Sequence, residues 1–402
     1  MNTTPFTIGT FGLGCVGRGF LELLDASGGT AAHVKHICVK ERGRERNAGS
    51  ARLTYNALDI LTDDDVHAIV ELTNDPVLAL DVIRHALTTG RHAITASKKV
   101  VAENLAELIA LQRSTGRSLL YEASCAGSIP IVRVLETHFP GEEVHRVAGI
   151  LNGTTNYILT RAEEECLHPS EALKRAQVAG YAEVDPRSDL NGDDARFKLV
   201  ILIAHAFGTL LKPREILRHG IEGLEAVDLE FGRDNGWVVR SIATARRSRH
   251  GLLAHVLPTF LPSTDPFAGV REEYNAVLIE GAHSGTHLLR GKGAGSLPTG
   301  LAVLSDVQQL ARGGGYSYSK VAAQAPQLAA GHELLEVYAR IPSTHQELLA
   351  RFDRVNLVGT SASCVRFTGR ISLFELGQLI GDGREGFQVI VLPHLSAHSE
   401  KR

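Results

Sequence analysis

Residues 180–198 gather several acidic side chains directly before a strongly apolar segment, and one lysine lies among its first residues. Asp194 and Lys198 are four positions apart, so on a helix their side chains share one face. The preceding loop adds the carboxylates of Glu183 and Asp189. Such a cluster could bind an amino group while the lysine acts on a carbonyl oxygen. The alternative is an exposed ion pair without chemistry, which would contribute only about 0.3–0.5 kcal/mol.

A second pattern with chemical meaning is the glycine motif near the N-terminus. It has the form G-x-G-x-x-G and lies between a β-rich run, residues 6–11, and a helical pattern. The first glycine permits a tight turn, the second lets the backbone approach a pyrophosphate, and the third allows close helix–strand packing. A glycine-rich turn without a ligand is the alternative. We predict a dinucleotide site that includes Gly12, Leu13, Gly14, Cys15, Val16 and Gly17.

The charged run at residues 40–46 bears on which dinucleotide is preferred. An acidic residue after the second strand would bind a ribose 2′-hydroxyl, whereas basic residues suit a 2′-phosphate. Four bases, beginning with Lys40 and including Arg44, outnumber two acids here. The run favours NADP, with NAD as the other possibility, and a solvated charged turn is the alternative interpretation.

The elements that must position these groups follow from the hydrophobic pattern. Short apolar runs alternate with helical segments through residue 125, which predicts an α/β fold with a doubly wound parallel sheet, a Rossmann-type domain. We expect this NAD(P)-binding domain at 1–127, completed by a helix at about 298–312. Residues 128–297 mix long helices with β-like segments and predict an α+β catalytic domain, whose first helix has Ser128 as its N-cap. Residues 334–402 predict a small C-terminal α/β domain.

Composition limits the possible functions further. The 402 residues are 44% hydrophobic and carry a formal charge of −3, which offers no general attraction to nucleic acid or to an anionic membrane. The longest apolar runs fall short of the roughly 18 residues that a membrane span needs. The sequence starts without a recognisable signal peptide, and its five dispersed cysteines suit reduced thiols. We therefore expect a cytoplasmic protein.

Five separated blocks resemble the homoserine dehydrogenase family in sequence and in order. They are TASKK at 95–99, YEASCAGSIPI at 121–131, ILNGTTNYILT at 150–160, AQVAGYAEVDPRSDLNGDDARFK at 176–198 and GKGAGSLPTGLAVLSD at 291–306. The resemblance covers about residues 6–312. It implies reversible, NAD(P)-dependent reduction of L-aspartate 4-semialdehyde to L-homoserine, a step in threonine and methionine biosynthesis, by a homodimer.

The resemblance also implies a role for individual residues. Lys198 would transfer the proton, and Asp194 would orient the side chain of Lys198. Lys98 would lie near nicotinamide and substrate. Glu183 would hold the substrate amino group, with Asp189 in support. Thr73 and Gly295 would touch the cofactor. A monovalent cation, expected to be sodium, would be held by Glu122 with the backbone oxygens of Cys125, Gly127 and Ile129.

Some positions depart from the family pattern, and two other functions fit parts of the sequence. Ser97 replaces an asparagine, and Cys125-Ala126-Gly127-Ser128 replaces a glycine-richer loop. For Glu122, capping of the next turn is the structural alternative to a cation site. A phosphorylating semialdehyde dehydrogenase would use a nucleophilic cysteine, for which Cys125 is the candidate. A non-enzymatic NADP sensor is the other alternative. The C-terminal residues occupy the place of an ACT regulatory domain without its Asp-x-Pro-Gly start.

Overall fold

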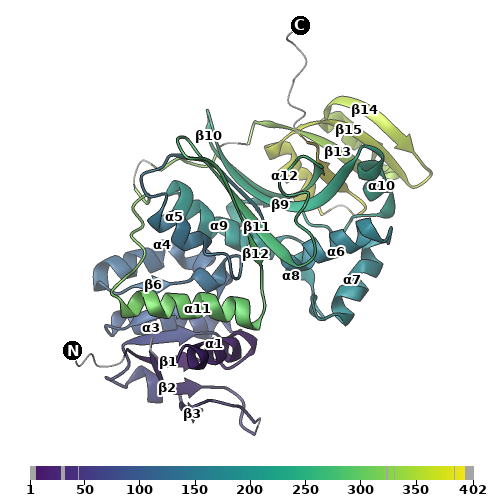
Figure 1. Ribbon diagram of the computed structural model, residues 1–402. Coiled ribbons are helices and arrows are strands. Elements are labelled where there is room, and N and C mark those ends of the chain that lie inside the picture. Colours follow the sequence, from purple (N-terminus) through teal and green to yellow (C-terminus); the bar gives the residue numbers. More distant parts are fainter. Residues whose placement is uncertain are drawn as a thin grey trace.

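A computed structural model describes residues 6–28, 32–43, 45–322, 325–329, 331–383 and 385–393. The chain forms two β-sheets, with α9 (Asp193–Phe207) between them (Figure 1). Helix α9 is buried on almost every side, as a helix with an apolar circumference must be. The groups that could do chemistry therefore lie where the two sheets approach one another.

The first sheet confirms the predicted doubly wound fold. Its six parallel strands have the order β3-β2-β1-β4-β5-β6. Their buried positions are mainly apolar, as expected for strands covered on both faces. The strands are β1 (Thr7–Phe11), β2 (His33–Cys38), β3 (Arg52–Thr54), β4 (Ala68–Glu71), β5 (His92–Thr95) and β6 (Leu119–Leu120). The sequence reading missed β3, because three residues show no periodicity.

Helices α1 (Cys15–Ala26), α2 (Leu58–Leu61), α3 (Pro76–Thr88) and α4 (Lys98–Thr115) connect these strands. A fifth helix, α11 (Ser296–Ala311), returns from far along the chain and packs against α1. A Cβ atom at Gly19 would lie 2.1 Å from the backbone oxygen of Ser296, and one at Gly300 would lie 2.5 Å from the amide nitrogen of Phe20. Only glycine at these positions allows the two helices to approach so closely.

The second sheet has ten strands, and its main path runs β12-β11-β7-β9-β10-β16-β13-β15-β14, with β8 paired to β10. The strands of the expected small C-terminal domain continue the central sheet, and with their helix they enclose a core of their own. The strands are β7 (Val144–Ile150), β8 (Leu217–Arg218), β9 (Trp237–Ser248), β10 (Gly251–Pro262), β11 (Tyr274–Gly281), β12 (Gly285–Lys292), β13 (Leu334–Pro342), β14 (Asp353–Thr360), β15 (Cys364–Ser372) and β16 (Gln388–Val391).

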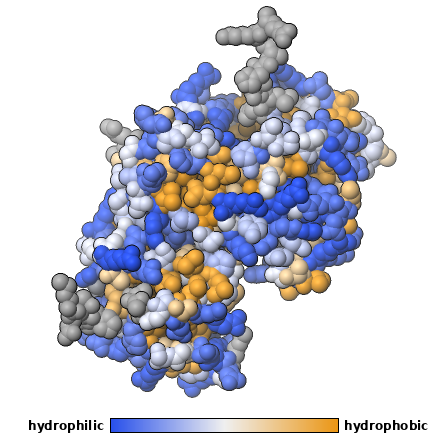
Figure 2. All heavy atoms as spheres, viewed as in Figure 1, coloured by the Kyte–Doolittle hydropathy of each residue, from blue (hydrophilic) through white to orange (hydrophobic). Residues whose placement is uncertain are grey.

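The remaining helices surround this sheet. They are α5 (Ile131–Thr137), α6 (Gly153–Glu164), α7 (Pro169–Val178), α8 (Arg187–Leu190), α10 (Ala226–Asp234) and α12 (Leu373–Gly381), with short 3-10 helices at Glu122–Ser124, Pro213–Glu215 and Ser343–Arg351. None of the described helices combines the length and apolar character that crossing a bilayer requires. Figure 2 shows apolar residues gathered over the central strands on the visible face.

The predicted N-cap at Ser128 is wrong. Helix α5 begins at Ile131, and the Ser128 hydroxyl lies 3.2 Å from the backbone oxygen of Lys292, to which it donates. The carboxylate of Glu122 accepts the amides of Val132 and Arg133 instead, at 2.9 and 2.8 Å. A charged acceptor at this end is favoured by the helix dipole, but it comes from ten residues earlier in the chain.

Candidate active site

Three predicted site segments follow three neighbouring strands of the parallel sheet. The glycine loop follows β1, Thr73 follows β4, and Lys98 begins α4 just after β5. Because parallel strands present their carboxyl ends at one edge, these segments line the same crevice. This is the edge at which doubly wound sheets bind dinucleotides.

The glycine loop has the geometry that its motif predicts. Gly12 has a φ of 94°, and a Cβ atom there would lie 2.6 Å from the backbone oxygen of Leu72. A Cβ atom at Gly17 would lie 2.9 Å from the backbone oxygen of Gly12. Gly14 faces open space, with nothing within 4 Å of the position of a Cβ atom. The first and third glycines are thus required by the fold, whereas the second leaves room for a ligand.

Helix α1 starts at Cys15, immediately after Gly14, and no side chain of the described residues caps it. Its first amide groups are therefore available to an anion, which a helix N-terminus attracts. Gly295, with a φ of 124°, starts α11, and the Ser296 hydroxyl donates to the backbone oxygen of Cys15 at 2.7 Å. This contact places Gly295 beside the glycine loop. Leu13 is buried and Val16 is half-buried behind it.

A buried glutamate that the sequence reading missed arranges the neighbouring strand ends. Glu71 accepts the amide and the hydroxyl of Thr73 at 2.6 and 2.7 Å, and the hydroxyl of Thr95 at 2.6 Å. Thr95 in turn accepts the amide of Ser97, next to Lys98. Burial raises the pKa of Glu71. A lone acidic residue at the end of a strand matches no sequence motif, so Glu71 could not be predicted as a site residue. Its role is to hold Thr73 through two hydrogen bonds.

Asp194 is the centre of the second part of the site. Its Oδ2 atom accepts from Lys198 Nζ at 2.7 Å, and its Oδ1 atom pairs with Lys98 Nζ. The side chain of Asp194 is 3% exposed, that of Lys198 is 10% exposed, and that of Lys98 is 41% exposed. Lys198 also donates to the backbone oxygen of Leu151 at 2.7 Å. Two ammonium groups from separate segments thus converge on one carboxylate beside the cofactor crevice.

These contacts set the charge of the cluster. Burial by itself would raise the pKa of Asp194, but the ammonium groups of Lys198 and Lys98 outweigh it and hold that pKa well below its usual range. The carboxylate of Asp194 raises the pKa of Lys98, although burial opposes the rise. Asp194 is therefore a fixed anion, and Lys98 remains an ammonium group at neutral pH.

Asn152 connects the two acidic residues nearest the lysines, and the sequence reading did not single it out. Its amide nitrogen donates to Asp189 at 2.7 Å and to Asp194 at 2.8 Å. Its side-chain oxygen accepts the amide of Thr155 and so caps α6. The position lies within the family block at 150–160, which was the available signal.

The predicted substrate residues lie at the mouth of this cluster. Asp189 is half-buried, and burial together with the charge of Asp194 raises its pKa. Glu183 is exposed on the loop before α8, and its backbone oxygen accepts a hydrogen bond from the side chain of Gln177. Glu183 is near enough to Lys98 to contribute to the raised pKa of that lysine.

The loop expected to hold a cation runs from Glu122 to Ile129. Ala126 and Gly127 both have positive φ, 51° and 59°, so the loop turns sharply there. The carboxylate of Glu122 is already occupied as the cap of α5, and burial raises its pKa to about 7. Among the described residues, no group of three or more His, Cys, Asp and Glu side chains is placed to hold a metal ion. Cation binding here would rest on backbone oxygens.

Cys125 is buried, and burial raises the pKa of its thiol to about 12. A thiol of this kind is a poor nucleophile, because the thiolate is the reactive form. The geometry therefore does not favour the cysteine-dependent alternative.

The charged turn follows β2, the strand next to β1 on the side away from β4. Lys40 is exposed there, and the guanidinium of Arg42 lies 5.1 Å from the centre of the Tyr55 ring. Arg44, which contributed to the prediction of NADP, lies outside the described residues.

Comparisons with known proteins identify the family. Residues 12–122 match the model for the NAD-binding domain of homoserine dehydrogenase, and residues 130–308 match the homoserine dehydrogenase model. The homoserine dehydrogenase of Bacillus subtilis is 34% identical over 309 residues, which cover 75% of this chain and 71% of the relative. That of Lactococcus lactis is 37% identical over 254 residues, or 63% of this chain and 59% of the relative, so the match spans less than two thirds of that protein.

Solved structures agree with these matches. A homoserine dehydrogenase from Thiobacillus denitrificans has a TM-score of 0.85 at 28% identity, with 97% of this chain and 98% of that chain covered. The similarity therefore extends through the C-terminal strands. Together with the dinucleotide crevice and the lysine–aspartate cluster beside it, these matches confirm the predicted family. The chain belongs to the homoserine dehydrogenase family of NAD(P)-binding oxidoreductases.

Proposed function

We propose that this protein catalyses the reversible reduction of L-aspartate 4-semialdehyde to L-homoserine, with Lys198, Asp194 and Lys98 as its catalytic residues. The observation that carries the proposal is the convergence of Lys98 and Lys198 on Asp194 beside the carboxyl edge of the parallel sheet. Reduction of an aldehyde develops negative charge on its oxygen, and two ammonium groups stabilise that charge before one of them gives up a proton.

The nicotinamide, when bound in the crevice, supplies the hydride in reduction and accepts it in oxidation. Lys198 acts as the general acid in one direction and as the general base in the other. Asp194 holds both lysines in place and prevents their mutual repulsion from separating them. Lys98, the more exposed of the two, would lie near the carbonyl oxygen and the nicotinamide end of the cofactor.

Substrate selection in this proposal depends on the acidic loop. The substrate carries an α-amino group as well as a carbonyl, and Glu183 would bind the amino group. Asp189 supports this contact, because Asn152 fixes it next to Asp194. Within the part of the chain that the structure describes, the Glu183 carboxylate makes no hydrogen bond or ion pair, so it is available for the amine.

The dinucleotide that we propose as the cofactor is NADP, with NAD as the alternative. Lys40 and the other bases of the turn after β2 would meet the 2′-phosphate, while the glycine loop, Thr73 and Gly295 would contact the rest of the molecule. Sodium would be held by Glu122 with the backbone oxygens of Cys125, Gly127 and Ile129, on the loop that turns sharply at Ala126 and Gly127.

Assembly as a homodimer through residues 128–297 is supported by the outer strand of the large sheet. Strand β12 ends the sheet at this side, and its Leu288 is 43% exposed. Exposed apolar groups at a sheet edge favour contact with another chain. The five unpaired cysteines are consistent with a cytoplasmic location.

Initial rates with L-homoserine and either NADP or NAD test the function directly. We expect turnover with both and a lower KM for NADP. Lys198→Ala should lose nearly all turnover while its affinity for NADPH, measured by fluorescence titration, stays unchanged. Lys174→Ala, an exposed lysine on α7, is the control. Parallel loss of nucleotide binding in Lys198→Ala would show that the lysine supports folding and would refute its catalytic role.

A further inference from the structure

Two arginines lie directly opposite one another on neighbouring strands of the large sheet. Arg146 on β7 is the register partner of Arg246 on β9. Their neighbours Val147 and Ala245 share the core with α9, so by strand alternation the arginines lie on the other face of the sheet. Like charges directly opposite in antiparallel strands are destabilising. Glu280 pairs with Arg146 at 3.1 Å and Glu333 pairs with Arg246, so each arginine has a counter-ion, but each glutamate accepts from only one side of a group that has five N–H donors.

Two further polar side chains of this face are buried with unused hydrogen-bonding atoms. Thr244 on β9 and His255 on β10 are register partners, and they are 8% and 9% exposed. Thr244 Oγ1 and His255 Nδ1 have no hydrogen-bond partner among the described residues. Burial, with the charges of Arg246 and Arg146, lowers the pKa of His255 to about 3, so the ring is neutral. Buried polar atoms left without partners are unfavourable unless a ligand or water satisfies them.

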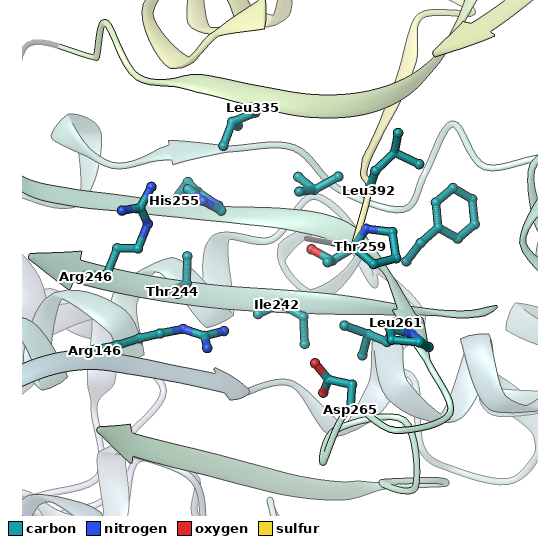
Figure 3. Close-up of a pocket in the computed structure, with 14 residues that line it drawn as sticks. Arg146, Ile242, Thr244, Arg246, His255, Thr259, Leu261, Asp265, Leu335 and Leu392 are labelled. Carbon is teal, nitrogen blue, oxygen red and sulfur yellow. The ribbon is translucent and has the colours of Figure 1, made fainter. Parts of the chain in front are cut away.

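These four residues line one cavity of about 500 Å³, and none of its lining residues belongs to the lysine–aspartate cluster. Figure 3 shows the side chains of Arg146, Arg246 and His255 at one end of it, with Ile242 farther along the same sheet face. The opposite wall comes from the C-terminal strands and includes Leu335 and Leu392. The cavity therefore joins a cationic, donor-rich end to an apolar end.

We propose that this cavity is a binding site for a small monocarboxylate with an apolar tail. The carboxylate lies between Arg146 and Arg246, where it relieves their repulsion, and accepts hydrogen bonds from Thr244 and His255. The tail packs against Ile242 and the C-terminal leucines. Asp265 also lines the cavity, on the side of Ile242 that is away from Arg246 (Figure 3). Its Oδ1 atom accepts a hydrogen bond from the backbone amide of Phe267 at 2.8 Å. A second negative charge would meet this aspartate, so dicarboxylates bind less well.

The cavity is connected to the catalytic cluster by two short paths, and this part of the proposal rests on the proposed function. Strand β7 carries Arg146 and continues into Leu151 and Asn152, which contact Lys198 and Asp194. Strand β10 carries His255 and pairs in parallel with β8, which ends at Arg218. Arg218 donates a hydrogen bond to Asp193 in the first turn of α9, at 2.7 Å. A ligand that moves β7 or β10 therefore alters the position of the first turn of α9, and with it the KM for homoserine.

Titration calorimetry of the intact protein tests the site without any need for turnover. Sodium 3-methylbutanoate is the probe, 3-methylbutan-1-ol is its uncharged analogue, and glutarate is the dianion. We expect saturable binding of the probe, no measurable binding of the alcohol, and weaker binding of glutarate. Arg246→Gln should weaken binding about tenfold or more, the effect of losing one charge-assisted hydrogen bond. Arg249→Gln, an exposed residue on the turn between β9 and β10, should bind as the unmodified protein does.

Thr244→Val supplies a variant that leaves every ion pair in place. It should bind the probe less tightly, yet melt at a higher temperature without ligand, because it removes a buried hydroxyl that lacks a partner. Absence of saturable binding, equal binding of the alcohol, or unchanged binding by Arg246→Gln would overturn the proposed site. If the unmodified protein does not bind the probe and Arg246→Gln dissociates a dimer, the two arginines instead form a contact between two copies of this chain, and the proposed site is refuted. Probe binding with an unchanged KM for homoserine would refute the connection to the active site alone.

Discussion

Replacement of Asp194 by asparagine keeps the shape of the side chain and removes the charge that holds the two lysines together. At the 2.7 Å separation of Asp194 and Lys198, Coulomb's law with an effective dielectric constant of about 20 gives roughly 6 kcal/mol of attraction. Asparagine also avoids the cost of burying a carboxylate, which offsets part of this loss. Breaking a buried ion pair on one side typically costs about 3–5 kcal/mol, and we expect Asp194→Asn to lose that much stability.

Asp193→Asn is the matched control, because the two aspartates are adjacent in the first turn of α9. Asp193 pairs with Arg196 and Arg218 at a site where its side chain is 20% exposed. Partly exposed pairs of this kind are worth about 1 kcal/mol or less. Urea unfolding followed by circular dichroism at pH 7 should therefore show a much larger loss for Asp194→Asn. Equal losses in the two variants would refute the idea that Asp194 is the counter-ion of both lysines.

The stability lost in Asp194→Asn should also depend on pH. The pKa of Asp194 in the folded protein lies below its ordinary value of 3.8, so its charge stabilises the fold above about pH 4. That contribution is lost as the pH falls through the folded pKa. The stability difference between the unmodified protein and Asp194→Asn should be complete at pH 7 and become smaller below about pH 4. A difference that grows on acidification would contradict the assigned direction of the pKa shift.

Three further outcomes follow from the site. Gly14→Ala should fold normally and bind NADPH weakly, whereas Gly17→Ala should lose thermal stability because its methyl group would lie 2.9 Å from a backbone oxygen; equal melting temperatures would contradict this distinction. Lys98→Ala should reduce kcat by at least tenfold, while the exposed neighbour in Lys99→Ala should leave it unchanged, as steady-state rates would show. Cys125 should resist iodoacetamide at pH 8 under native conditions, measured by mass spectrometry of its peptide, because its thiol is buried with a pKa of about 12; rapid labelling there would reopen the cysteine-dependent alternative.

Local patterns predicted the elements that lie close together in sequence. The alternation of short apolar runs and helices was sufficient for the parallel sheet, and the spacing of Asp194 and Lys198 was sufficient for their shared helix face. The approach of Lys98 to the same carboxylate was expected only through the family resemblance, because nothing in the residues around 98 refers to residue 194. Resemblance of several ordered blocks supplied information that periodicity cannot contain.

Contacts between distant segments account for what was missed. Glu122 caps α5 across ten residues, so a search for a local cap pointed to Ser128 instead. Strand β16 pairs with β10 more than a hundred residues away, and this pairing joins the C-terminal strands to the central sheet. The opposed arginines 146 and 246 were equally invisible, because strand register is set by the packing of both sheet faces and not by either strand alone.

The return of α11 to the first sheet has a practical consequence for dividing the protein. The chain leaves the dinucleotide-binding half near residue 122 and supplies its last helix only at residues 296–311, so the two halves cannot be separated by one cut. A fragment that stops at residue 127 would leave the glycine-lined surface of α1 bare to water. Joining residues 296–312 to that fragment through a flexible linker should restore a folded protein that binds the nucleotide. Residues 128–295, which this joining leaves out, could then be exchanged as one unit for the substrate-binding half of a relative.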